Sequence, residues 1–179
     1  MSPVFRILML AVAVLCGGIP GSGGGEAHAA SKFRERVEMI GFRPYVEGEI
    51  YEAVHKALAT ELEPYEKPEE GKKPRRLTLY IATVDLNRDG IPEIMASTDR
   101  AMFEVDKGGE NPPVYVFSVD PGAKDLRPLG AFPAASVLLG SLYTGQYRNL
   151  LVNPDIRTPT RFISYRMNID RWSYVVWEE

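Results

Sequence analysis

The stretch TVDLNRDGIPEI, residues 83–94, constrains the fold more than any other part of this chain. It carries oxygen-bearing side chains on alternate positions before a glycine, and a further carboxylate after it; these are Asp85, Asn87, Asp89 and Glu93. Alternate side chains turn to the same side of a tight bend, and Gly90 provides the backbone freedom that such a bend requires. Apolar residues alternate before the stretch, as they do in strands. We therefore predict two strands joined by a loop that collects oxygen ligands.

Oxygen ligands in this pattern are typical of a calcium site. Calcium takes about six to eight oxygen ligands, and a loop supplies them when alternate side chains point inward. A backbone carbonyl would complete the set at loop position seven. The predicted metal ligands are Asp85, Asn87, Asp89, Glu93 and the carbonyl of Ile91. An EF-hand is excluded because Ala96 stands where that loop needs a bidentate glutamate, and because the flanking segments have the pattern of strands.

A plain hairpin turn is the alternative interpretation of this loop. Asn, Asp and Gly are the residues that turns favour, so a turn explains residues 87–90 without any metal. It does not explain why acidic residues, Asp85 and Glu93, stand at both ends of the loop between largely apolar strands. We therefore favour the metal site.

The loop also resembles the D-x-[DN]-x-D-G-x-x-[DE] loops of FG-GAP repeats, the calcium loops of integrin-type β-propellers and of related secreted bacterial proteins. The resemblance implies ligand roles for Asp85, Asn87, Asp89 and Glu93, with Glu93 standing where the repeats usually carry aspartate. Further on, GQYRNLLV and SYRMNIDRWSYVV resemble the closing strands of exported proteins with a single FG-GAP-like or VCBS-like loop, although Asn149 replaces an expected aspartate. A propeller needs at least about four blades, and this chain has one such loop. The resemblance implies a fold more than an activity.

Residues 1–29 have the pattern of a secretory signal peptide. Arg6 precedes an apolar run at residues 7–15, and Ala27, His28 and Ala29 form a small-x-small cleavage site. The run is shorter than the roughly 20 residues of a membrane span, so we expect no transmembrane segment in the mature chain. We predict a periplasmic or secreted bacterial protein. The alternative is a lipoprotein anchored through Cys16, although such anchors usually have a small residue just before the cysteine.

Charge and cysteine content narrow the class of protein further. Removal of the predicted signal peptide also removes Cys16, the only cysteine, so an exported domain of this sequence must depend on its core or on a bound metal rather than on disulfides. The net charge of −3 gives no attraction to nucleic acid. We expect an unidentified protein or glycan partner in the cell envelope.

The remaining pattern predicts one globular domain over residues 30–179. It divides into a helical segment at 30–64, a linker at 65–76 and a β-rich part at 77–179. Helices are expected at residues 31–40 and 47–62, with Pro64 beyond the end of the second helix. Strands are expected at 77–84, 94–97, 114–119, near 135, and at 147–152, 161–167 and 172–177, the last two forming a hairpin. The predicted fold class is α+β: N-terminal helices packed on a mostly antiparallel sheet, with strand 77–84 in its middle.

Few residues in this chain are candidates for catalysis. His55 is the only histidine outside the signal peptide, so triads and histidine-rich zinc sites have no support. We predict a calcium-binding accessory or binding domain without catalytic activity. The alternative is a hydrolase that cleaves envelope polymers with paired carboxylates, drawn from Asp99, Glu104 and Asp106. The pattern leaves open whether the C-terminal aromatic residues form core or a binding patch; they are Tyr165, Trp172, Tyr174 and Trp177.

Overall fold

A computed structural model describes residues 36–67, 76–98, 111–120, 122, 125–155, 157–158 and 160–177. The predicted signal peptide, with Cys16, lies outside the described residues. So do the three acidic residues proposed for a hydrolase, Asp99, Glu104 and Asp106.

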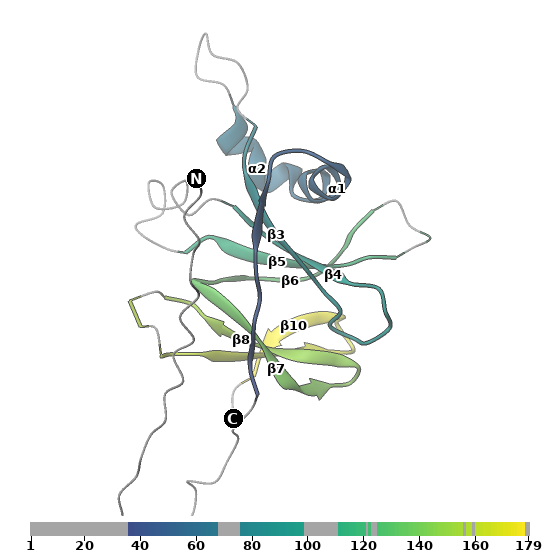
Figure 1. Ribbon diagram of the computed structural model, residues 1–179, viewed down its shortest axis with the longest axis vertical. Helices are drawn as coiled ribbons and strands as arrows, with labels where there is room; N and C mark the ends of the chain where they lie inside the picture. Colours follow the sequence, from purple (N-terminus) through teal and green to yellow (C-terminus); the bar gives the residue numbers. More distant parts are fainter. Residues whose placement is uncertain are drawn as a thin grey trace, which may run out of the picture. The chain divides into compact units, whose positions relative to one another are not determined.

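Within the described residues, the strands form two antiparallel sheets of five strands each (Figure 1). The first, which we call the β3 sheet, contains β2 (Arg43–Tyr45), β3 (Leu79–Val84), β4 (Glu93–Thr98), β5 (Pro113–Ser118) and β6 (Arg127–Pro133), in that order. The second, the β8 sheet, contains β1 (Glu38–Met39), β7 (Ser136–Thr144), β8 (Tyr147–Asn153), β9 (Ile163–Asn168) and β10 (Ser173–Val176). The prediction of mostly antiparallel strands is confirmed. The prediction of a single sheet was wrong, because the strands form two sheets.

The alternation along β3 explains how the layers stack. Leu79 and Ile81 belong to a core shared with the helices, whereas Ala82 belongs to a core shared with the β8 sheet. Neighbouring side chains on a strand point to opposite faces, so a strand that is apolar on both faces is covered on both. The β3 sheet therefore lies between the helices and the β8 sheet, as Figure 1 shows. The prediction that this strand lies inside a sheet is confirmed by its position between β2 and β4.

Two short helices cover the outer face of the β3 sheet. They are α1 (Glu49–Ala57) and α2 (Ala59–Glu66); they contribute the buried residues Tyr51, Val54 and Leu62, and Leu58 between them is buried in the same core. The prediction of one continuous helix ending before Pro64 was wrong. The backbone leaves helical geometry at Leu58 (φ −105°, ψ 14°), and Pro64 lies inside α2. The predicted linker accordingly begins later than residue 65.

The helix predicted at residues 31–40 was also wrong over its described part. Residues 38–39 form β1, which pairs with β7, and the chain then crosses to the other sheet, where β2 pairs with β3. Val37 is 50% exposed while Ile40 is 9% exposed, so the expected helical face is not buried. The free edges of two sheets supply backbone partners that the helical spacing of apolar residues did not reveal.

Most of the other predicted strands are confirmed within a residue or two, including the β9–β10 hairpin. β6 was missed because Pro128 and Pro133 argue against a strand. The strand lies at the edge of the β3 sheet, where a residue without an N–H group is tolerated. Among the described residues, neither helix is long and apolar enough to cross a membrane.

Candidate metal site in the β3–β4 loop

The loop between β3 and β4 begins with an aspartate that holds the bend together. One carboxylate oxygen of Asp85 accepts a hydrogen bond from the N–H of Arg88 (2.7 Å), and the other accepts one from the N–H of Gly90 (3.1 Å). Gly90 has a φ of 85°, the left-handed conformation that was expected at this position. The Asp85 side chain therefore faces the inside of the bend rather than solvent alone.

Two more polar side chains fold back into the same loop. Asn87 Oδ1 accepts from the N–H of Asp89 (3.0 Å), and Asp89 Oδ1 accepts from the N–H of Ile91 (2.7 Å). The Asn87 amide also donates to the second oxygen of Asp89 at 2.8 Å. The structure thus brings two of the predicted ligand side chains, Asn87 and Asp89, into contact, and folds a third, Asp85, back onto the same loop. Local side-chain to backbone bonds of this kind are what Asn and Asp form in turns.

Glu93 differs from these three because it is buried. It is the first residue of β4 and only 2% exposed, and its Oε2 accepts a hydrogen bond from the N–H of Leu86 at 2.7 Å. Burial, to which the nearby charges of Asp89 and Asp85 add, raises the pKa of Glu93 from 4.5 to about 7. The charged form of this carboxyl is therefore disfavoured near neutral pH, unless a positive charge is close by.

A chain of hydrogen bonds runs from Glu93 across to the β8 sheet. Leu86, whose N–H donates to Glu93, uses its carbonyl to accept from the N–H of Arg148 in β8 at 2.7 Å. The carbonyl of Arg148 accepts in turn from the hydroxyl of Tyr174 in β10 at 2.8 Å. We call Glu93, Leu86, Arg148 and Tyr174 the inter-sheet chain. It fixes the β3–β4 loop to the opposite sheet.

Two apolar or aromatic contacts strengthen this attachment. The Leu86 side chain is fully buried in the core between the sheets. The guanidinium of Arg88 lies 4.2 Å from the centre of the Tyr143 ring in β7, a cation–π contact. Arg88 holds a φ of 63°, which non-glycine residues rarely adopt. The loop therefore packs against the opposite sheet and is not a free hairpin turn.

The donor chemistry of the loop fits calcium in part. The described residues contain no group of three or more His, Cys, Asp or Glu side chains close enough to hold a metal. Asp89 contacts the amide of Asn87, Asp85 accepts from N–H groups of the same loop, and Glu93 has one oxygen committed to the N–H of Leu86. Each carboxylate has about four lone-pair sites, so an oxygen that accepts an N–H can still coordinate a cation. Ile91, predicted to offer its carbonyl, lies in the loop and donates its N–H to Asp89.

The other residues singled out in the sequence have structural partners. His55 is half-buried; its Nε2 lies 2.7 Å from a carboxylate oxygen of Glu66, and its ring stacks on Tyr51. Among the C-terminal aromatic residues, Tyr174 is buried and Tyr165 half-buried in the core between the sheets. Trp172 and Trp177 are each 45% exposed and are packed under arginine guanidinium groups. The aromatic set therefore divides between core and surface.

No protein-family model matches this chain, and no curated protein or solved structure is significantly similar to it. The sequence prediction of the loop missed Leu86, Arg148 and Tyr174. Leu86 was the available signal, because a large apolar residue inside a polar loop indicates that part of the loop is buried. Arg148 acts through its backbone, which no residue pattern indicates.

Proposed function

We propose that this chain is an exported bacterial accessory or binding domain without catalytic activity, and that calcium bound by the β3–β4 loop stiffens it. We propose that the protein is periplasmic or secreted and that its partner is a protein or glycan of the cell envelope. The observation that carries the proposal is that the Asp85, Asn87 and Asp89 side chains all fold back onto N–H groups of one loop, which is fixed to the opposite sheet. The antiparallel β3–loop–β4 unit also has the strand context of an FG-GAP-like calcium loop.

The charge balance of the loop supports a divalent cation. Two aspartates lie within one bend, and the buried carboxyl of Glu93 lies close enough for both to raise its pKa. Like charges that are held together destabilise the folded state, and a bound cation removes that cost. Residues Asp85, Asn87, Asp89 and Glu93, with the Ile91 carbonyl, would hold the ion. Calcium would supply charge neutralisation and loop rigidity there, and no chemical step.

The position of the loop suggests what calcium would do for the domain. Leu86 is hydrogen-bonded to β8 through its carbonyl. A more rigid loop therefore also makes the contact between the two sheets more rigid. A site formed only in the folded state raises stability by RT ln(1 + [Ca]/Kd). With Kd of about 0.1 to 1 mM, as in extracellular modules, 5 mM calcium adds roughly 1 to 2 kcal/mol and raises Tm by a few degrees.

The test compares thermal unfolding in excess chelator and in 5 mM calcium, with 5 mM magnesium as a second condition. Magnesium should give a smaller shift because it resists dehydration and demands a tighter octahedron. The Asp89→Asn variant removes one ligand charge but keeps an acceptor for the N–H of Ile91. We expect it to lose most of the calcium shift.

Asp170→Asn is the matched control, because Asp170 is exposed in the β9–β10 turn and the substitution changes the net charge equally. It should keep the full calcium shift. A wild-type chain that melts at one temperature in chelator and in calcium would refute the proposal, and so would equal calcium shifts in the Asp89→Asn and Asp170→Asn variants. The loop would then be a plain turn.

A further inference from the structure

A second candidate site lies on the β8 sheet, beside the β3–β4 loop. It is a cavity of about 370 Å³ whose walls come from the start of β1, the loop, β7 and β8. We call it the arginine pocket. Its charged and polar lining residues are Arg36, Glu38, Arg88, Ser141, Tyr143 and Arg148. Three guanidinium groups and one carboxylate give the lining a net charge of +2, in a chain whose overall net charge is −3.

Arg148 is held in place by neighbouring strands. The register between β7 and β8 shifts between Leu139 and Tyr143, and Arg148 Nε donates to the carbonyl of Gly140 in this irregular stretch at 2.9 Å. Its Nη1 donates to Glu38 Oε2 in β1 at 3.2 Å, and its side chain is only 18% exposed. Irregular pairing of this kind redirects side chains, and it is frequent beside functional sites. The guanidinium of Arg148 is therefore fixed in the wall of the pocket.

Arg88 contributes to the same pocket from the β3–β4 loop. Its guanidinium lies 4.2 Å from the centre of the Tyr143 ring, and Tyr143 is the residue of β7 that pairs with Arg148 of β8. The backbone of Arg88 has a φ of 63°, a strained conformation of the kind found at functional sites. The carboxylates of Asp85 and Asp89 instead accept from N–H groups of the bend. Of the charged residues in this described loop, only Arg88 lines the pocket.

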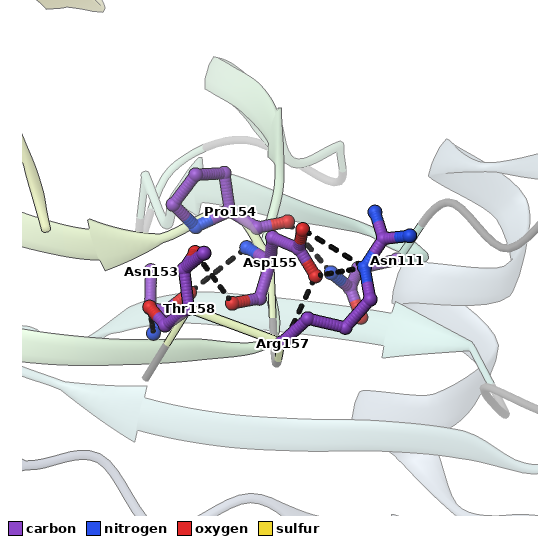
Figure 2. Close-up of polar contacts among 6 residues, drawn as sticks. All are labelled: Asn111, Asn153, Pro154, Asp155, Arg157 and Thr158. Atoms are coloured by element: carbon purple, nitrogen blue, oxygen red, sulfur yellow. Dashed lines mark hydrogen bonds and ion pairs between the residues drawn. The ribbon is translucent and has the colours of Figure 1, made fainter. Parts of the chain in front are cut away.

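The arginines of the pocket differ from an arginine that an acidic neighbour neutralises. Figure 2 shows such a case beyond the end of β8, where Arg157 Nε donates to both carboxylate oxygens of Asp155, at 2.9 and 3.0 Å. Neither Arg36 nor Arg88 forms an ion pair with another described residue. The positive charge of these two side chains is therefore available to an anion in the pocket.

The chemistry of the lining defines which anion fits. A guanidinium donates two parallel N–H bonds to a carboxylate or a phosphate, and hydrogen bonds between ionised groups are roughly twice as strong as neutral ones. A phosphate monoester carries a charge of about −1.5 to −2 at neutral pH, which matches the charge of the pocket more closely than a single carboxylate does. The hydroxyl of Ser141 adds a neutral donor to the lining.

We propose that the arginine pocket binds a small soluble phosphate monoester, with the phosphate held by Arg36, Arg88 and Arg148. The volume of about 370 Å³ lies at the lower end of ligand pockets, which span about 300–1,000 Å³, so the body of the ester is compact, such as one sugar ring. An anionic membrane surface is repelled by the overall charge of −3, whereas a small ester meets mainly the local charge of the pocket. The proposal does not depend on calcium binding, because none of the proposed calcium ligands lines the pocket.

The probe is glucose 6-phosphate, and glucose is the matched compound that lacks the anion. Both are titrated into the ¹⁵N-labelled chain and followed by NMR, after a chelating resin has removed metal ions so that phosphate cannot bind through calcium. Glucose 6-phosphate should shift the amide signals of pocket residues such as Val37, Ser141 and Tyr143, and glucose should not. Added salt should weaken the binding, because the contact is between charged groups.

Arg88→Gln and Arg36→Gln each remove one guanidinium, from two different segments of the pocket wall. Each variant should bind glucose 6-phosphate roughly 10- to 100-fold more weakly than wild type, since a hydrogen bond to a charged group is worth about 1.5–3 kcal/mol. Arg157→Gln is the matched control, because it removes the same charge from the turn in Figure 2. It should leave the affinity unchanged.

Three results would overturn the proposal: glucose 6-phosphate shifts no pocket signals, glucose binds as tightly as its phosphate, or both pocket variants bind the ester as Arg157→Gln does. Vesicles that contain phosphatidic acid present the same phosphate monoester on a lipid. Binding of these vesicles without binding of glucose 6-phosphate would also overturn the proposal of a soluble ligand, and would assign the pocket to a lipid headgroup.

Discussion

Replacing Glu93 with glutamine separates the charge of this buried side chain from its hydrogen bond. Glutamine has nearly the same shape, and its side-chain carbonyl can still accept from the N–H of Leu86. The charge cannot form in the variant. Any difference between wild type and Glu93→Gln that depends on pH therefore reports the carboxyl itself.

The magnitude follows from the pKa of Glu93. A tenfold change in proton affinity is about 1.4 kcal/mol, so a pKa raised from 4.5 to about 7 corresponds to roughly 3 kcal/mol. Because the folded-state pKa lies above the unfolded one, this stability is fully present below pH 4.5 and is lost as the pH rises through about 7. In chelator, Glu93→Gln should match wild type at acidic pH. At pH 8 it should be more stable by up to about 3 kcal/mol.

The assay is urea unfolding of both chains in chelator, at closely spaced values from pH 4.5 to pH 8. Titrating groups that do not interact with Glu93 affect both chains alike, so the difference between the two free energies of unfolding reports Glu93 together with its neighbours Asp85 and Asp89. The difference should open between pH 4.5 and about 7. Parallel profiles across this range would show that burial does not raise the pKa of Glu93 in the folded chain.

The remaining predictions concern the packing of the loop and one turn. Leu86→Ala should lower the free energy of unfolding by about 2–5 kcal/mol, because Leu86 is fully buried between the sheets; Leu142→Ala, at a residue 40% exposed, should cost far less in the same urea experiment. Gly145→Ala should cost at least about 1 kcal/mol, because its φ of 62° is unfavourable for alanine and an added Cβ would lie 2.7 Å from the Ile169 side chain. Gly41→Ala, where an added Cβ meets nothing within 4 Å, should show no such loss of Tm.

The parts of the fold that local pattern determines were predictable. The alternation at residues 77–84 predicted a strand in the middle of a sheet, and β3 lies between β2 and β4. The oxygen-bearing residues of the loop predicted a tight bend, and Asp85, Asn87 and Asp89 form it. Both signals depend on neighbours in sequence, which a single sequence shows directly.

The parts that depend on distant pairing were not predictable in the same way. β1 and β2 are short strands, and each exists because the edge of another strand supplies its partner: β7 for one and β3 for the other. The apolar spacing at residues 31–40, which include β1, fits a helix equally well. β6 contains prolines that local rules count against a strand, and only its edge position makes them tolerable. Sheet edges are a property of the assembled fold.

The burial of Glu93 shows why the ligand pattern of the loop could be predicted from the sequence, whereas the attachment of the loop to the opposite sheet could not. A carboxylate in such a sequence pattern indicates a metal ligand. In the structure, burial disfavours the charged form of Glu93, and one of its oxygens already accepts a hydrogen bond from the N–H of Leu86. The ligand role and the burial of Glu93 are compatible if Glu93 is ionised only when a cation is bound in the loop. A cation in the loop would favour ionised Glu93, and an ionised carboxylate accepts a stronger hydrogen bond from the Leu86 N–H. The proposed calcium would then act on the contact between the sheets through Leu86 and Arg148, not only on the loop that binds it.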